Sequence, residues 1–108
     1  MATKIHHFIG GVRVESNSTR FSPVFDPSTG EQAAEVALAT IGEVDAAIES
    51  SRQALATWSA TTPLNRARVL FKYKELLENN REALATLISK EHGKVLSDAM
   101  GEVTRGIE

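Results

Sequence analysis

The 108-residue sequence contains no cysteine, and this absence limits the chemistry that it can carry. Without thiols the chain cannot form disulfides, cannot bind a metal through thiolates and has no cysteine nucleophile. A chain without cysteine suits a cytosolic protein, which does not need disulfides to be stable. We therefore expect a cytoplasmic protein, and any thiol chemistry associated with it must come from residues outside this sequence.

Long apolar runs and a strong charge imbalance are also missing. No segment approaches the roughly 18 apolar residues of a membrane span, and the first residues lack the pattern of a secretory signal. The formal net charge is −2, whereas nucleic-acid-binding domains are usually basic. The basic side chains between positions 66 and 74 project to different sides of the expected helix and form no single stripe: Arg66, Arg68, Lys72 and Lys74. We expect no membrane or nucleic-acid partner.

The first 38 residues carry strand and turn signals. Two short β-rich runs, 5–9 and 12–15, flank Gly10 and Gly11, and paired glycines supply the positive φ angles that tight hairpin turns require. Residues 23–25 are expected to be extended, 26–30 to form a turn with proline and glycine at the favoured positions, and 31–38 to form a third strand.

Residues 40–108 carry the signals of four helices. Thr40 and Glu43 have the spacing of a capping box at the start of the first helix. Thr62 and Pro63 are a typical N-cap and first helical residue for the second. The sequence therefore predicts an α+β fold with a small antiparallel hairpin and about four helices, strand-rich over 1–38 and helical over 40–108.

The third and fourth helices have different endings. Asn80 is expected to cap the third helix and Gly93 to end it. The fourth begins near Val95, and its apolar positions recur at helical spacing as far as Ile107 with no capping residue after them. We expect the 108 residues to be the front part of a larger protein.

The second helix has a broad apolar surface that covers about two-thirds of its circumference, wider than a surface helix of a small domain needs. The residues concerned are Leu64, Val69, Leu70, Phe71, Tyr73, Leu76 and Leu77. This helix should contact partners on more than one side, so we expect the chain to form a homo-oligomer through exposed apolar helix faces.

Candidate functional side chains are few. His6, His7 and His92 do not share a face suited to a metal, and we interpret them as structural or surface residues. Glu102 and Arg105 lie at i, i+3 on the last helix, where two interpretations stay open. Arg105 either pairs with Glu102 in a helix that packs closely at its interior glycines, or faces a pocket as a fixed cation that binds a carboxylate.

Five segments, in the family's order and at its spacing, resemble the N-terminal region of the aldehyde dehydrogenase superfamily. They are 8–11, 26–31, the capped helix ending near Trp58, 66–70 and 91–94. The run 91–99, followed by 101–103 and 105–108, is most similar to the CoA-acylating methylmalonate-semialdehyde dehydrogenases.

This resemblance implies an α/β parent protein in which residues 1–108 are the N-terminal portion of a Rossmann-type NAD-binding domain. It implies oxidation of methylmalonate or malonate semialdehyde to an acyl-CoA, with NAD and coenzyme A as cofactors and the remainder of the dehydrogenase chain as partner. The nucleophilic cysteine, the general-base glutamate and the glycine-rich cofactor loop lie downstream in the family. Residues 1–108 alone are therefore expected to bind no cofactor and to be inactive.

The resemblance also assigns roles to individual residues. Arg105 matches the arginine that the semialdehyde subfamily uses for the substrate carboxylate. Glu102 matches an acidic position near the monovalent-cation site of some members, and the carbonyls of Val24 and Phe25 match backbone ligands of that site. The alternative is a free-standing helical interaction or oligomerisation module without catalysis. A reading frame that continues beyond Glu108 into a glycine-rich loop and a reactive cysteine would distinguish the dehydrogenase from this module.

Overall fold

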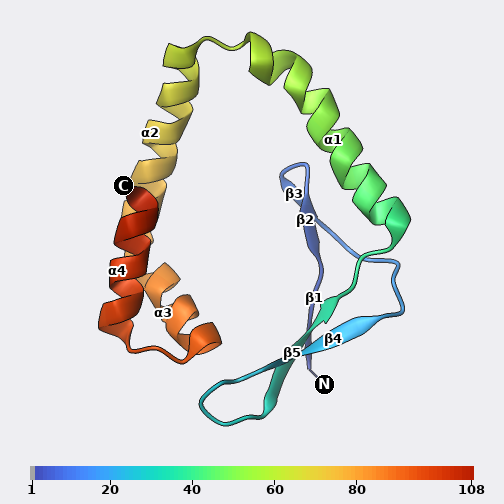
Figure 1. The fold of residues 1–108 in the computed structure, drawn as a ribbon, viewed down its shortest axis with the longest axis vertical. Helices are drawn as coiled ribbons and strands as arrows, with labels where there is room; N and C mark the ends of the chain where they lie inside the picture. Colours follow the sequence, from blue (N-terminus) through green and yellow to red (C-terminus); the bar gives the residue numbers. More distant parts are fainter. Residues whose placement is uncertain (1) are drawn as a thin grey trace. The chain divides into compact units, whose positions relative to one another are not determined.

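The computed structural model describes residues 2–108, and these form two compact units. The first unit contains residues 2–25 and 31–60, and the second contains residues 26–30 and 61–108. Within the described residues, five strands are followed along the chain by four helices (Figure 1). This order confirms the predicted α+β fold.

The larger sheet has three strands in the order β1-β5-β4. β5 (Gln32–Ala37) lies in the centre, with β1 (Thr3–Ile5) parallel on one side and β4 (Phe21–Phe25) antiparallel on the other. The register of β4 and β5 shifts between Val24 and Phe25. The parallel pairing of β1 with β5 was not expected from the sequence.

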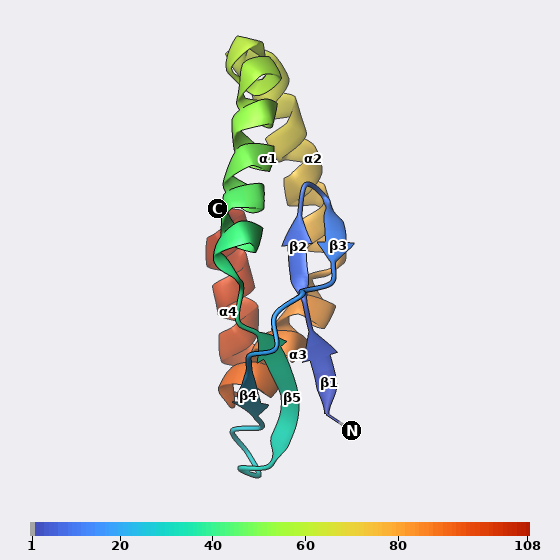
Figure 2. The same ribbon diagram turned by 90° about the vertical axis from the view of Figure 1, so that its right-hand side faces the viewer.

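The smaller sheet is the predicted hairpin, formed by β2 (His7–Ile9) and β3 (Val12–Val14). Gly10 and Gly11 form its turn with φ of 62° and 81°. These angles confirm the prediction that both glycines adopt the positive φ of a tight hairpin turn. The predicted single strand over 5–9 is divided at His6, where the chain passes from the larger sheet into the hairpin (Figure 2). His6 Nδ1 accepts a hydrogen bond from Ser16 N at 3.1 Å at this junction.

The first two helices begin as predicted. α1 (Ile41–Ala60) has a complete capping box, in which Glu43 N donates to Thr40 Oγ1 at 3.2 Å and Thr40 N donates to Glu43 Oε2 at 2.7 Å. α2 (Pro63–Asn79) has Pro63 at its start, and Thr62 Oγ1 accepts from Asn65 N at 3.4 Å.

The third helix begins at the predicted place but without the expected side-chain cap. Asn80 precedes α3 (Arg81–His92), but its side chain makes no cap hydrogen bond to that helix. Its Nδ2 instead donates to Leu76 O at 2.8 Å and so satisfies a carbonyl at the C-terminal end of α2. Its φ of −110° and ψ of 13° also differ from the extended backbone that is typical of an N-cap. Asn80 therefore occupies the predicted N-cap position of α3, where its carbonyl accepts from Leu84 N at 2.9 Å, but the capping by its side chain does not form.

The end of α3 agrees with the prediction, and it positions the fourth helix. Gly93 has φ of 82°, and its N–H donates to Ser89 O at 2.8 Å. α4 (Leu96–Ile107) follows and packs along α3. The buried residues Ala85, Ala99 and Val103 form the contact. Small side chains at these positions allow the two helices to approach closely.

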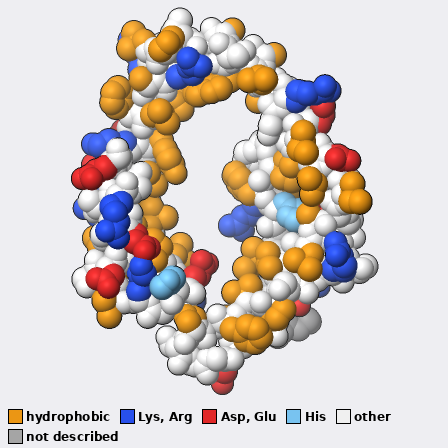
Figure 3. Space-filling view, viewed as in Figure 1, with side chains coloured by type: hydrophobic (Ala, Val, Ile, Leu, Met, Phe, Trp, Pro, Cys, Tyr) orange, Lys and Arg blue, Asp and Glu red, His pale blue; other side chains and the backbone are white. Residues whose placement is uncertain are grey.

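Neither α1 nor α2 has a buried residue. Hydrophobic side chains are visible along both helices (Figure 3). On α2, Leu70, Phe71 and Tyr73 are 62%, 68% and 57% exposed, so much of its predicted apolar surface is uncovered by the described residues. Among those residues, no helix is long and apolar enough to cross a membrane.

Candidate functional site

The packing of α4 determines which of its side chains are available for binding. Ala99 and Val103 are buried against α3, whereas Arg105 is exposed. Two positions separate Arg105 from Val103, so the helical turn carries its side chain away from the face that packs. The structure therefore places Arg105 on an accessible part of α4, as binding of a ligand would require.

Glu102 is bound by a residue outside its own helix. Lys94, in the segment between α3 and α4, donates from Nζ to Glu102 Oε1. The Lys94 side chain is 19% exposed and that of Glu102 is 38% exposed, so the ion pair is partly shielded from solvent. This contact could not be predicted from the sequence, because eight residues separate the partners and no helical periodicity relates them.

The Glu102–Arg105 ion pair, one of the two interpretations of this helix, is not formed. Among the described residues, the only ion pair of Glu102 is with Lys94, and the Arg105 guanidinium has neither a hydrogen bond nor an ion pair. The interior glycines likewise give no support for close packing, because an added Cβ at Gly101 or Gly106 would meet nothing within 4 Å. The interpretation of α4 as a closely packed helix with a Glu102–Arg105 pair therefore lacks both the ion pair and the packing at its glycines.

The surroundings of Glu102 favour its charged form. The pKa of this carboxyl is lowered mainly by the hydrogen bond from Lys94, and partial burial opposes the shift. The positive charges of Lys94, His92 and Arg105 lower it further. Three basic side chains thus favour the carboxylate, and of these only Lys94 is hydrogen-bonded to it.

The residues of the predicted cation site are divided between the two units. Val24 and Phe25 lie on β4, where the register shift can release backbone carbonyls from regular pairing, and Glu102 lies on α4. The described residues contain no group of three or more His, Cys, Asp or Glu side chains suited to a metal. Since Glu102 already meets the Lys94 ammonium, its charge is less available to a cation. The monovalent-cation site stays a prediction.

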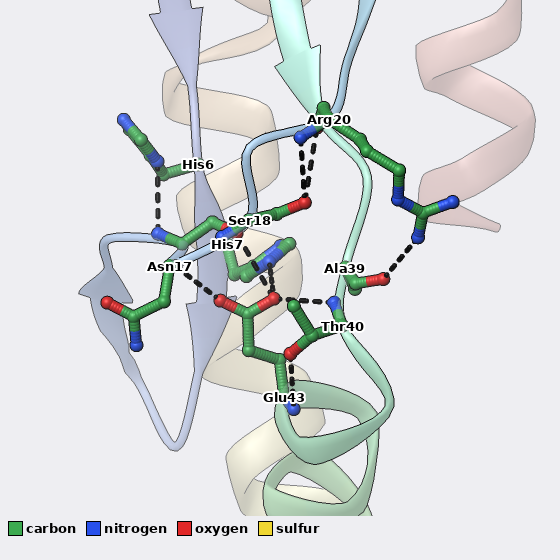
Figure 4. Close-up of polar contacts among 9 residues, drawn as sticks. His6, His7, Asn17, Ser18, Arg20, Ala39, Thr40 and Glu43 are labelled. Carbon is green, nitrogen blue, oxygen red and sulfur yellow. Dashed lines mark hydrogen bonds and ion pairs between the residues drawn. The ribbon is translucent and has the colours of Figure 1, made fainter.

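A second polar centre, around Glu43, is found in the first unit (Figure 4). Besides Thr40 N, its carboxylate accepts hydrogen bonds from Asn17 N at 2.7 Å and Ser16 Oγ at 3.1 Å, and it lies 3.4 Å from His7 Nε2. These bonds lower the pKa of Glu43 to about 2, with Thr40 as the largest cause. One carboxylate therefore connects α1 with β2 and with the segment after β3.

The capping box identified only part of this centre. The Thr40–Glu43 spacing is a local signal, whereas the contacts with Asn17 and Ser16 span more than 25 residues and have no sequence pattern. His6 and His7 contact different partners, Ser16 and Glu43, as expected for structural histidines. His92 is the exposed last residue of α3.

Most of the basic residues on α2 have polar partners on the same helix. Lys72 pairs with Glu75 at 2.9 Å and Lys74 with Glu78 at 3.1 Å. Arg68 donates to Asn65 Oδ1 at 3.1 Å. These contacts are those of solvated surface charges, and the absence of a nucleic-acid partner stays a prediction.

Comparison with known proteins relates this geometry to one family. Residues 13–108 match the aldehyde dehydrogenase family. Malonate-semialdehyde dehydrogenase 2 of Bacillus thuringiensis (strain Al Hakam) is 48% identical over 104 residues, which are 96% of this chain and 21% of that protein. The chain thus spans about a fifth of the length of the curated relatives that it matches.

Solved structures show the same similarity. A protein of Sinorhizobium meliloti 1021, assigned as a methylmalonate-semialdehyde dehydrogenase and complexed with NAD, is 45% identical with a TM-score of 0.95, over 99% of this chain and 22% of that one. An NAD-dependent benzaldehyde dehydrogenase of Corynebacterium glutamicum is 38% identical with a TM-score of 0.87, over 94% and 22% of the two chains. Enzymes named for different aldehydes therefore share this part of the fold.

Proposed function

The chain belongs to the aldehyde dehydrogenase family, and from this premise we propose that it serves as the N-terminal part of an NAD-dependent semialdehyde dehydrogenase. The proposed reaction oxidises malonate or methylmalonate semialdehyde and releases an acyl-CoA. The 48% identity with a malonate-semialdehyde dehydrogenase and the TM-score of 0.95 with a protein assigned to the methylmalonate enzyme support this substrate class.

Arg105 is the residue through which this chain would contribute to specificity. A semialdehyde acid differs from a simple aldehyde in its carboxylate, and a guanidinium binds a carboxylate through two parallel hydrogen bonds. The exposed Arg105 without a partner in the second unit is the observation that carries the proposal. Since the family includes an enzyme named for benzaldehyde, the fold alone does not define the substrate.

A charged hydrogen bond contributes about 1.5–3 kcal/mol. At about 1.4 kcal/mol for each factor of ten, Arg105 would favour the semialdehyde acid over an uncharged aldehyde by roughly ten- to a hundredfold. This preference should act mainly on substrate binding, because the carboxylate is not the group that reacts.

By themselves, the described residues lack the groups needed to bind NAD and to carry out the covalent steps. Gly10 and Gly11 form a hairpin turn and are not followed by a helix, so they do not make the phosphate-binding loop of a dinucleotide fold. No cysteine is present to attack an aldehyde. In the whole dehydrogenase NAD would accept the hydride and coenzyme A the acyl group, and other parts of that protein would hold them.

The remainder of a dehydrogenase chain, or a second copy, is the proposed partner of the exposed apolar surface. α1 and α2 have no buried residue, and each exposed square ångström of apolar surface costs about 25 cal/mol when left in water. Covering these helices would therefore stabilise the protein. The cytoplasm is the proposed location, as the absence of cysteine suggests.

A chimera tests the proposal with the chain as it exists. Residues 1–108 replace the matched fifth of the Bacillus thuringiensis enzyme, and formation of NADH from malonate semialdehyde is measured with coenzyme A present. We expect activity from the chimera and none from the Bacillus enzyme without its N-terminal fifth. A folded chimera without activity, or one that oxidises only uncharged aldehydes, would contradict the proposed function.

A further inference from the structure

Glu102 lies near the basic side chains of Lys94, His92 and Arg105, and the structure shows which of them binds it. Arg105 lies three residues further along α4, a spacing at which oppositely charged side chains can meet on a helix. Lys94 lies before the helix begins. The carboxylate is bound by Lys94, and Arg105 is left without a partner among the residues described.

The position of Lys94 explains this preference. Gly93, with φ of 82°, ends α3, and the short segment that follows leads into α4. The Lys94 side chain is largely shielded, at 19% exposure, so its ammonium has lost part of its hydration and gains from a nearby carboxylate. Arg105 is exposed and remains hydrated, so it gains less from Glu102.

We propose that Lys94 is a positioning residue for substrate specificity, because by binding Glu102 it leaves Arg105 available to a carboxylate ligand. The inference rests on the proposed function of Arg105. If Lys94 lost its charge, Glu102 would turn to Arg105, since the two have the spacing of an intrahelical pair. The substrate carboxylate would then compete with a carboxylate of the protein for the same guanidinium.

The experiment measures KM and kcat for malonate semialdehyde and for propanal in the active chimera. Lys94→Gln should raise KM for the semialdehyde about two- to tenfold. The lower limit corresponds to the energy of an exposed ion pair and the upper limit to that of a shielded charged hydrogen bond. Both the kcat for the semialdehyde and the kinetics with propanal should stay unchanged. Lys72→Gln is the matched control, because it breaks an exposed Lys–Glu pair on α2 and should alter neither substrate.

Rescue separates a charge effect from a packing effect. Removing the competing carboxylate in Lys94→Gln/Glu102→Gln should bring KM for the semialdehyde back towards its original value, and Lys94→Arg should preserve that value. An unchanged KM in Lys94→Gln would overturn the proposal, as would a double variant no better than Lys94→Gln. Failure of both Lys94→Gln and Lys94→Met to fold would also overturn it, because Lys94 would then be a structural residue.

Arg105→Leu distinguishes this inference from the proposed function. If Arg105→Leu abolishes the preference for the semialdehyde and Lys94→Gln has no effect, only the role of Lys94 is refuted. If Arg105→Leu leaves the preference unchanged, the proposed role of Arg105 fails as well.

Discussion

Replacing Gly93 by alanine should destabilise the second compact unit, because this glycine combines two constraints. Its φ of 82° is in the left-handed region, which alanine adopts only with strain. An added Cβ would also lie 3.2 Å from Cβ and Cγ of Pro27, in the Asp26–Gly30 segment of the same unit. Each constraint adds to the cost of the substitution.

Gly30 provides a way to estimate the first constraint alone. It has φ of 76°, but an added Cβ would meet nothing within 4 Å. The left-handed backbone costs a non-glycine residue about 1–2 kcal/mol, and the reduced freedom of the unfolded chain returns about 0.4–1 kcal/mol. Gly30→Ala should thus cost about 1 kcal/mol or less, and Gly93→Ala about 1–2 kcal/mol, with the difference due to Pro27.

Thermal unfolding followed by circular dichroism measures both variants. For a chain of this length 1 kcal/mol corresponds to about 5 °C in Tm, so we expect Tm to fall by up to about 5 °C for Gly30→Ala and by about 5–10 °C for Gly93→Ala. Gly101→Ala is the control, and it should raise Tm because alanine stabilises a helix interior where no neighbour obstructs it. A Gly93→Ala variant no less stable than Gly30→Ala would show that the Pro27 contact adds nothing to the cost.

Three further predictions concern the first unit and the whole chain. Thr40→Ala should cost about 1 kcal/mol in urea unfolding, because α1 loses its N-cap, and an equally stable variant would show that the capping box is unimportant. The pKa of Glu43 is lowered to about 2, so its ionised form stabilises the fold above pH 4.5 and this contribution is lost as the pH falls from 4.5 to 2. Tm of Glu43→Gln should vary less over that interval than Tm of the unchanged chain, and parallel curves would contradict this. Calorimetric titration of residues 1–108 with NAD should show no binding, and micromolar affinity would contradict the absence of a cofactor loop.

The elements that could be predicted from the sequence are those with local causes. Gly10 and Gly11 indicate a hairpin because few other residues adopt their φ angles, and Gly93 ends a helix for the same reason. The Thr40–Glu43 capping box depends on residues three positions apart. Each of these signals is contained in a few neighbouring residues, so a linear pattern is enough to reveal it.

The elements that could not be predicted depend on contacts between distant segments. The parallel pairing joins Thr3 with Ala34, and nothing near either residue indicates its partner. Asn80 stands between two helices, and no local pattern indicates that its side chain bonds the end of α2 instead of the start of α3.

The candidate site shows the same division between local and distant causes. The resemblance identified Arg105, and helical periodicity placed it on the same helix as Glu102. The Lys94 contact excludes one of the two interpretations left open, the Glu102–Arg105 pair, because a partly buried ammonium from outside the helix binds the carboxylate instead. A favourable i, i+3 spacing shows that a pair can form, but the surrounding structure decides whether it does.

We propose above all that Arg105 lets this chain select a semialdehyde acid within a dehydrogenase. The most direct measurement is the ratio of kcat/KM for malonate semialdehyde to kcat/KM for propanal, in the chimera with and without Arg105→Leu. The ratio should fall about ten- to a hundredfold through a higher KM for the semialdehyde, while propanal is unaffected. An equal loss for both substrates, or an unchanged ratio, would contradict it.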